Sequence, residues 1–308
     1  MKKLISLPLL MLFLYSFGQP QKTVYMFSSF RGNGNDGLHL AYSYDGLSWI
    51  ALRHDSSFLK PAAGKDKLMR DPCIITGPDK KFHMVWTVSW FEKGIGYASS
   101  PDLIHWSEQK YIPVMEHEHD ALNCWAPEIF YDNDNGDYMI YWSTTIPGRF
   151  PGTDTTGDKN LNHRLYYTTT RDFITFSDTK LLLDPGFNVI DAVIKKAGDK
   201  YIMFLKNETL RPEPEKNIRI TWSKYLTHGW EEVSEPITPD WCEGPTAIKI
   251  NGWWIVYFDM YRKHQMGAVT SEDLINWNNI TDDVHFPEGT RHGTVFETTV
   301  SVLERIKD

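Results

Sequence analysis

Five segments of the chain repeat one pattern, and this repeat limits the possible folds more than any other feature of the sequence. Each segment has a short apolar strand, a turn rich in Ser, Asp, Lys or Gly, and an aromatic residue that opens the next strand. The segments are residues 38–52, 95–109, 164–178, 218–232 and 267–280, with closing aromatics Trp49, Trp106, Phe176, Trp230 and Trp277. These aromatics are 57, 70, 54 and 47 residues apart. A period of this length, with four strands in each unit, is typical of a β-propeller.

The strands themselves show the two-residue alternation of a half-buried sheet. Phe82, Met84 and Trp86 alternate with polar or smaller residues, and residues 138–142 and 201–205 repeat this alternation. Gly, Asp and Asn turns bound these runs, and no long stretch has a convincing helical pattern. The sequence therefore predicts an all-β fold.

A second repeat precedes the first in each unit. One or two polar residues come directly before a short apolar strand at "RDPCII" (70–75), "WAPEIF" (125–130), "IDAVI" (190–194), "CEGPTAI" (242–248) and "RHGTVF" (291–296). The fifth of these openers lies at the end of the chain, whereas the N-terminal segment 23–30 has none of its own. We therefore expect a five-bladed β-propeller of four-stranded blades, in which residues 291–302 pair with residues 23–30. This ring closure covers the sheet edge between the first and last blades. It also brings the five openers together at one end of the axis.

The N-terminal residues predict export. Two lysines precede an apolar run that ends at Phe17, and small residues surround a cleavage site at Gly18, so residues 1–18 are interpreted as a signal peptide. Residues 19–308 contain no low-complexity linker and are expected to form a single catalytic domain. We expect the mature protein to be a periplasmic or extracellular monomer.

Charge and apolar-run length argue against two classes of partner. A net charge of -8 disfavours binding to nucleic acid or to an anionic membrane surface. After the N-terminal run, no segment approaches the roughly 20 uninterrupted apolar residues of a membrane span. The cysteines Cys73, Cys124 and Cys242 lie far apart without metal-ligand spacing, and we expect them to be small buried residues.

Three of the five openers carry a carboxylate, at Asp71, Asp191 and Glu243. Gathering like charges is costly because each disfavours ionisation of its neighbours, so such clusters are typical of functional sites. Glycoside hydrolysis needs two carboxyl groups with different pKa values, one protonated to donate to the leaving oxygen and one ionised to activate water or to attack. A third acid can raise the pKa of the donor by repulsion. Glu128 lies two positions beyond the opener residue Ala126 and is a further candidate for substrate binding.

With these motifs, the chain resembles glycoside hydrolase family 43 over residues 23–304. Members of this family are five-bladed propeller enzymes that act on arabinose- and xylose-containing plant glycans. The resemblance implies inversion, with Asp71 in "RDPCI" as general base, Glu243 in "CEGPT" as general acid and Asp191 in "VIDAV" as the residue that adjusts the pKa of the acid. Ala192 departs from the family pattern, which has a proline after this Asp.

The resemblance implies two further site residues. Trp125 belongs to a Trp-Ala-Pro opener that the family shares, and we expect it to form the floor of the sugar site. His292 in "RHGT" matches a histidine that the family places on the axis, often near a calcium ion. Because calcium prefers oxygen ligands, we expect His292 to contact such an ion through water. No cofactor is expected to be required for the reaction.

Arg70 and Arg291 flank two of the openers, and their planar guanidinium groups are candidates for binding sugar hydroxyls or orienting a carboxylate. A structural ion pair with a carboxylate of the rim is the alternative for each. Residues 145–164 form a long loop rich in Gly, Pro and Asp, which is interpreted either as an insertion near the binding rim or as a surface excursion.

We expect an exo-acting glycosidase that releases a terminal pentose, α-L-arabinofuranose or β-xylose, from oligosaccharides or polysaccharide side chains. One alternative is a related propeller glycosidase that acts on β-galactose or anhydro-galactose units. The other is a non-catalytic glycan-binding propeller. The three rim acids argue against the binding module, which needs aromatics and amides but no pair of acids with separated pKa values.

Overall fold

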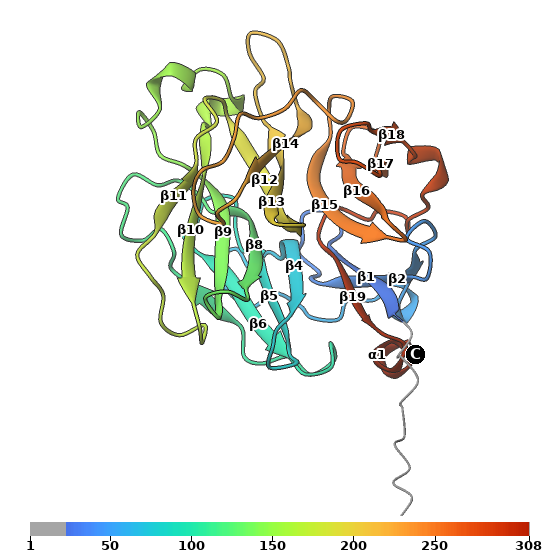
Figure 1. The fold of residues 1–308 in the computed structure, drawn as a ribbon. Coiled ribbons are helices and arrows are strands. Elements are labelled where there is room, and N and C mark those ends of the chain that lie inside the picture. The colour runs from blue at the N-terminus through green and yellow to red at the C-terminus, as the bar shows by residue number, and fades with distance from the viewer. Residues whose placement is uncertain (1–22, 308) are drawn as a thin grey trace, which may run out of the picture.

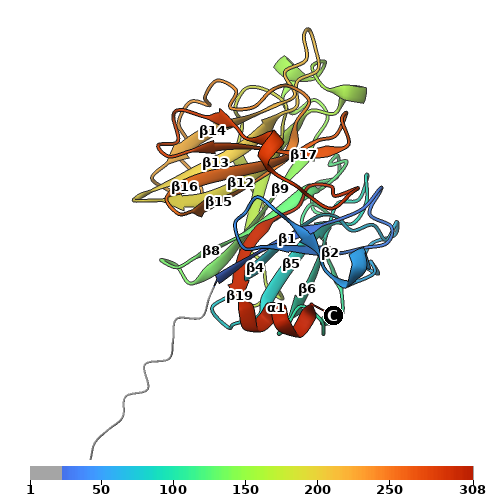
Figure 2. The same cartoon turned by 90° about the vertical axis from the view of Figure 1, so that its right-hand side faces the viewer.

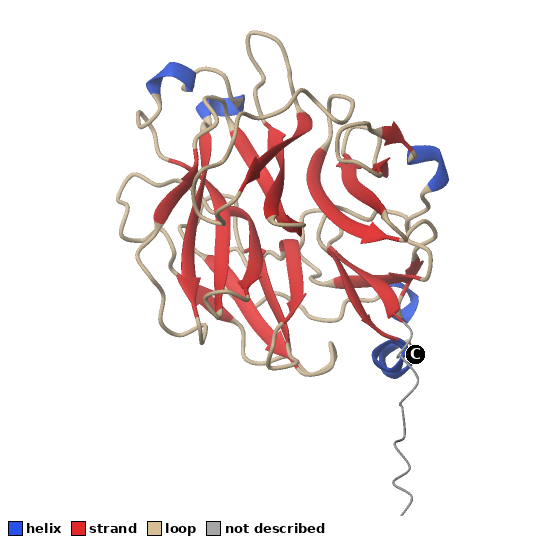
Figure 3. Ribbon diagram, in the orientation of Figure 1, coloured by secondary structure: helices blue, strands red, loops and turns tan. Residues whose placement is uncertain are grey.

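The computed structural model describes residues 23–307, and nearly all of their regular structure is β-strand (Figure 3). Five antiparallel sheets stand around a central axis and form the five blades of a propeller (Figure 1). Their innermost strands contact one another in turn around this axis. The predicted all-β, five-bladed β-propeller is therefore confirmed. The predicted signal peptide, residues 1–18, lies outside the described residues.

The strands of each blade follow one another outward from the axis. In that order, the first blade consists of β19 (Val295–Thr299), β1 (Thr23–Ser29), β2 (His39–Ser43) and β3 (Ile50–Ala51), and the second of β4 (Arg70–Thr76), β5 (Phe82–Thr87), β6 (Ile95–Ser100) and β7 (Lys110–Ile112). The third consists of β8 (Trp125–Asp132), β9 (Asp137–Thr145), β10 (His163–Thr170) and β11 (Lys180–Leu183), and the fourth of β12 (Val189–Ala197), β13 (Lys200–Asn207) and β14 (Asn217–Ser223). The fifth consists of β15 (Glu243–Ile250), β16 (Trp253–Met260), β17 (Gln265–Ser271) and β18 (Asn278–Asn279). The helices are the short 3₁₀ turns η1 (Arg53–Asp55), η2 (Pro151–Thr153), η3 (Asp158–Asn160) and η4 (Thr281–Asp283), and the α-helix α1 (Val300–Ile306).

The C-terminal end of the chain completes the first blade, as the sequence predicts, but the pairing ends at Thr299, because residues 300–302 belong to α1 instead of the predicted strand. β19 lies antiparallel to β1, with Thr23 opposite Thr299 and Phe27 opposite Val295. The N–H of Ser28 extends this pairing by donating to the carbonyl of Thr294 at 3.0 Å. The two strands lie side by side in Figure 1, and α1 follows directly from β19 (Figure 2). The pairing covers the inner edge of β1 and closes the ring of blades.

One blade has three strands instead of the four that we expected. Residues 231–238 run beside β14 but do not form a regular strand. The N–H of Ile220 donates to the hydroxyl of Ser234 at 3.0 Å, where a regular ladder would use a backbone carbonyl. Pro236 has no N–H to donate to a partner strand. Side-chain hydroxyls therefore replace part of the backbone ladder at this outer edge.

The repeated turn of the sequence has a common hydrogen-bond pattern. In the first blade, the hydroxyl of Ser43 donates to Asp45 Oδ1 at 2.8 Å, and the same oxygen accepts the N–H groups of Leu47 and Ser48 at 2.7 and 2.9 Å. Equivalent turns form around Asp102, Asp172 and Asp273. A short acid that accepts backbone N–H groups two and three positions ahead stabilises a tight turn. This pattern explains why Ser or Thr followed by Asp recurs before the outer strands.

Apolar side chains fill the spaces between neighbouring blades. Trp49 is 5% exposed and packs against the rings of Phe27, Tyr257 and Phe286, which joins the first blade to the last. The three cysteines are buried and free, as expected. Within residues 23–307, no helix has the length and apolar character that crossing a membrane requires.

Candidate active site

The same β-bulge opens the innermost strand of four blades. The strand register shifts after Arg70, Trp125, Ile190 and Glu243. The next residue has a positive φ in each case: Asp71 (51°), Ala126 (45°), Asp191 (50°) and Gly244 (56°). Left-handed backbone is unfavourable for residues with a side chain and is concentrated at functional sites. A bulge also redirects side chains, and here it turns the openers toward the axis.

A cavity of 390 Å³ lies at this end of the axis. All but one of the predicted site residues line it, namely Arg70, Asp71, Trp125, Asp191, Glu243, Arg291 and His292. Asp158 and Leu161 also line the cavity, so the loop 145–164 reaches the rim of the site. The five openers therefore converge on one cavity, as their positions in the sequence predict.

Asp71 is buried, and both of its carboxylate oxygens have partners. Its Oδ2 accepts a hydrogen bond from the hydroxyl of Thr87 at 2.7 Å, and its Oδ1 lies 2.7 Å from His292 Nε2. Burial raises the pKa of Asp71, but His292 and Arg70 outweigh burial and hold this pKa well below its usual range. Asp71 is therefore ionised at neutral pH, which is the state that a general base requires.

Glu243 accepts hydrogen bonds from two cationic side chains. Its Oε1 accepts a hydrogen bond from Arg291 Nη2 at 2.9 Å, and its Oε2 accepts one from Lys206 Nζ at 3.1 Å. Arg291 Nε also donates to Asp259 Oδ2 at 2.5 Å, and Asp259 lies opposite Glu243 on β16. Arg291 thus forms the ion pair that was the alternative to direct sugar binding, and it links two carboxylates.

Asp191 lies close to both of the other acids. Its Oδ2 accepts the N–H of Gly244, the residue after Glu243, at 3.0 Å. Burial raises the pKa of Asp191 to about 6; His292 and Lys206 oppose this rise, and the charges of Glu243 and Asp71 add to it. The interaction is mutual, so a charge on Asp191 disfavours a charge on Glu243.

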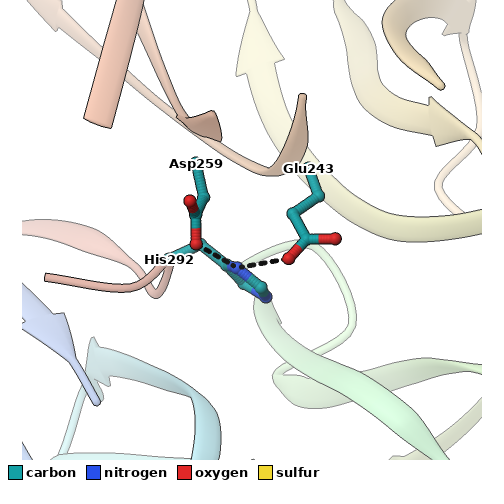
Figure 4. Close-up of side chains that lie close together, drawn as sticks. All are labelled: Glu243, Asp259 and His292. Atoms are coloured by element: carbon teal, nitrogen blue, oxygen red, sulfur yellow. Dashed lines mark hydrogen bonds and ion pairs between the residues drawn. The ribbon is translucent and has the colours of Figure 1, made fainter. Parts of the chain in front are cut away.

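His292 lies between the acids. Figure 4 shows its ring beside Asp259 and Glu243, whose oxygens are 3.4 and 3.7 Å from Nδ1. Its other nitrogen, Nε2, faces Asp71. Burial lowers the pKa of His292, but Asp71, Asp259 and Glu243 outweigh burial and raise this pKa to about 10. The ring is therefore an imidazolium at neutral pH, with an N–H on both nitrogens.

Glu243, Asp259 and His292 offer ligand atoms within 4.8 Å of one another, but they do not fit a calcium ion. An imidazolium has no free lone pair, and Arg291 already donates to both carboxylates. The three side chains therefore offer no direct calcium site in this charge state. The expected contact between His292 and calcium through water stays a prediction.

Glu128 is the predicted site residue that does not line the cavity. It lines a second cavity, of 340 Å³, together with Lys195 and Thr294. Its carboxylate accepts hydrogen bonds from the hydroxyl of Thr294 at 2.8 Å and the thiol of Cys73 at 3.1 Å, and burial raises its pKa to about 7. Glu128 is two positions beyond Ala126, a separation of about 7 Å along a strand, so its side chain lies farther down the axis than the openers. This position corrects the predicted substrate contact.

Aromatic and amide groups form one wall of the cavity. Trp125 donates from its ring nitrogen to the carbonyl of Trp90 at 2.9 Å, and the two rings meet edge to face at 5.4 Å. The guanidinium of Arg70 lies 4.2 Å from the Trp90 ring, and both residues donate to Asn33 Oδ1 at 3.1 Å. Arg70 is thus held by stacking and an amide. Such a wall suits the apolar face and the hydroxyls of a sugar.

The sequence motifs did not indicate three charged residues of the site, Lys206, Glu208 and Asp259. Lys206 and Asp259 each stand near the end of a strongly apolar strand, where a charged side chain is buried only with a partner. That position was the available signal. It could not identify the partner, because Lys206 is 37 residues from Glu243 in the chain.

Nearly the whole chain matches one protein family. A family model described as a probable glycosyl hydrolase domain, related to glycoside hydrolase family 43, covers residues 21–304. The chain belongs to this family. The convergent acids line the axial cavity of its propeller.

Individual relatives agree with this assignment. An α-L-arabinofuranosidase of Bifidobacterium longum is 29% identical in a match that covers 41% of this chain and 14% of that protein, so the chain spans a small part of this relative. A solved α-L-arabinofuranosidase from Clostridium thermocellum has a TM-score of 0.56 at 15% identity, with 81% of this chain and 86% of that chain covered. A solved family 43 β-1,3-galactosidase has a TM-score of 0.57 at 16% identity, with coverage of 82% and 55%. At these identities the solved structures establish the shared fold.

Proposed function

We propose that this glycoside hydrolase is an exo-acting, inverting enzyme that releases a terminal pentose, α-L-arabinofuranose or β-xylose. The observation that carries the proposal is the position of Asp71 and Glu243 on the two sides of the His292 ring, at 2.7 and 3.7 Å. One imidazole with these two contacts holds the two carboxylates within about 9.5 Å of each other, the largest gap that an inverting pair spans, and the resemblance to family 43 implies inversion.

In the proposed reaction, Asp71 takes a proton from a water molecule while the water oxygen attacks the anomeric carbon. Glu243 gives its proton to the glycosidic oxygen, which leaves with the electron pair of the broken bond. Asp71 starts ionised, because His292 and Arg70 favour its charged form. Glu243 must start protonated, and the neighbouring Asp191 favours that state by disfavouring a second negative charge.

The choice of a terminal sugar rests on the cavity and on the relatives. A cavity of 390 Å³ at the axis is in the size range of small-ligand sites. Two relatives named above are arabinofuranosidases, which supports a pentose. The galactosidase neighbour keeps β-galactose or anhydro-galactose as a second candidate. Export and a monomeric state remain part of the proposal. Export is based on the predicted signal peptide, residues 1–18, and the monomeric state on the expected single domain.

A panel of aryl glycosides tests the substrate. We expect release from the α-L-arabinofuranoside or the β-xyloside, and the highest kcat/KM identifies the sugar. Preference for the β-galactoside would support the second candidate. Binding of glycans without release from any glycoside would support the non-catalytic alternative. Proton NMR of the first-formed anomer tests inversion, and a retained anomer would contradict Asp71 as the base.

A further inference from the structure

Two buried lysines lie behind Glu243, and both contact Glu208. Lys206 Nζ is 2.5 Å from Glu208 Oε2, and Lys216 Nζ contacts the other oxygen, Oε1. The side chains of Lys206 and Lys216 are 2% and 6% exposed. Burial raises the pKa of Glu208, but the two ammonium groups outweigh burial and lower it, so Glu208 is an anion between two cations.

One of these lysines continues to the proposed acid. Lys206 Nζ donates to Glu243 Oε2 at 3.1 Å, so its ammonium bridges Glu208 and Glu243. Its backbone is fixed between two strands, opposite Ile190 and Ile218. Burial lowers the pKa of Lys206, but Glu208 and Glu243 outweigh burial and raise it well above its usual value. The bridge therefore carries a full positive charge at every working pH.

We propose that Lys206, held in place by Glu208, is a positioning residue that stabilises the ionised form of Glu243 as its proton leaves. This inference rests on the proposed function, in which Glu243 is the general acid. During the reaction the proton passes from Glu243 to the glycosidic oxygen, and the carboxyl group changes from neutral to anionic. An ammonium at 3.1 Å is attracted more strongly to the developing anion than to the neutral acid, which lowers the barrier to proton transfer.

The same contact has a cost that can be measured. An opposite charge in contact with a carboxyl group favours its ionised form, so we expect the alkaline limb of the pH–rate profile to lie lower with Lys206 than without it. Other charged and titratable groups that face Glu243 also influence this pH–rate profile. Those facing it are Asp191 of β12, Asp259 of β16, Tyr261 after β16, and Arg291 and His292 before β19.

Lys216 provides a matched control. It is buried to a similar degree and binds the same Glu208, but its ammonium makes no ion pair with Glu243 among the described residues. Its carbonyl accepts the N–H of Cys242 at 3.0 Å, so it also lies close to the opener that carries Glu243. Replacing either lysine removes one buried charge next to Glu208. Only Lys206→Met removes a charge in contact with Glu243.

The test is the pH dependence of kcat/KM for Lys206→Met and Lys216→Met, measured in the whole chain. For Lys206→Met we expect the alkaline limb to rise by about one pH unit or more, because a contacting opposite charge shifts a carboxyl group by about 1–3 units. We also expect a larger loss of kcat on a natural glycoside than on an activated aryl glycoside. The limb of Lys216→Met should shift less than half as far. An unchanged limb in Lys206→Met, or equal shifts in both variants, would overturn the inference.

Two further variants keep the test decisive if Lys206→Met does not fold. Lys206→Arg retains the charge and should keep the limb near its original position. Glu208→Gln removes one of the two anions that contact Lys206, so the ammonium interacts more strongly with Glu243. The alkaline limb of this variant should therefore move to lower pH, opposite in sign to the shift of Lys206→Met. A limb that does not move in Glu208→Gln would contradict the bridge. If Glu243→Gln loses hydrolysis of the natural substrate but the alkaline limbs of Lys206→Met and Glu208→Gln do not shift, this inference is rejected and the proposed function still stands.

Discussion

Glu243 can be tested by making its proton unavailable. Glu243→Gln keeps the shape of the side chain but cannot donate a proton to a leaving oxygen. Hydrolysis of a natural glycoside should fall by about 10²–10⁴, whereas an activated aryl glycoside, whose phenolate leaves with little help, should lose much less. Asp71→Asn should impair both substrates, because water must be activated whichever group departs. Steady-state kinetics on both substrates check this, and near-normal hydrolysis of the natural glycoside by Glu243→Gln would make Glu243 a structural acid.

Asp191 should influence the pH range over which the enzyme works. Its carboxyl has a pKa raised to about 6 by burial, and its charge and that of Glu243 disfavour each other. Asp191→Asn removes the negative neighbour and so favours the ionised form of Glu243, which should move the alkaline limb of kcat/KM to lower pH. The direction is opposite to that expected for Lys206→Met. A rise of the limb in Asp191→Asn would contradict a role in adjusting the acid.

At the scale of single elements, the bulge at the start of β15 depends on Gly244. A Cβ on this residue would lie 2.1 Å from His292 Cγ, and its φ is +56°. Gly244→Ala should therefore displace His292 and cost most of the activity. Gly252→Ala is the matched control, because its φ is +91° but nothing lies within 4 Å of the added Cβ. It should cost about 1–3 kcal/mol of stability from backbone strain and leave kcat unchanged. Equal loss of activity in both variants would show that strain alone explains the effect.

Ring closure depends on α1 as well as on β19. Leu303 and Ile306 of α1 are buried in the cluster that includes Val24 and Met26 of β1. Leu303→Ala should lower the free energy of unfolding by about 2–5 kcal/mol, as expected for a truncated core leucine. Glu304→Ala, on the exposed side of the same helix, should change it by less than about 0.5 kcal/mol. Urea unfolding of both variants checks this, and similar small losses would mean that α1 does not anchor the closure.

At the scale of the whole molecule, the charges on the axis should make stability depend on pH. The pKa of His292 is about 10 in the folded chain and about 6.5 in an unfolded chain. Its stabilising contribution is therefore fully present below about pH 6.5 and is lost as the pH rises toward 10. The free energy of unfolding should fall over this interval, with a slope of at most about 1.4 kcal/mol per pH unit for one proton. His292→Asn should flatten this part of the curve, and an unchanged slope would contradict the protonated ring.

The propeller, its ring closure and the convergence of the openers followed from the sequence, because each rests on local signals. Strand alternation, Asp turns and the polar residues before each inner strand are all written within short segments, and the late position of the opener at His292 places the last strand in the first blade. Four elements of the interpretation depended on the three-dimensional structure. The hydroxyl of Ser234 accepts a hydrogen bond where a regular fourth strand was expected, and Glu128 lines a second cavity instead of the site. The ring of His292 is protonated, and the ammonium of Lys206 donates to Glu243. These features depend on how far along a strand a side chain lies and which distant blade it meets, and no local pattern in a single sequence records either.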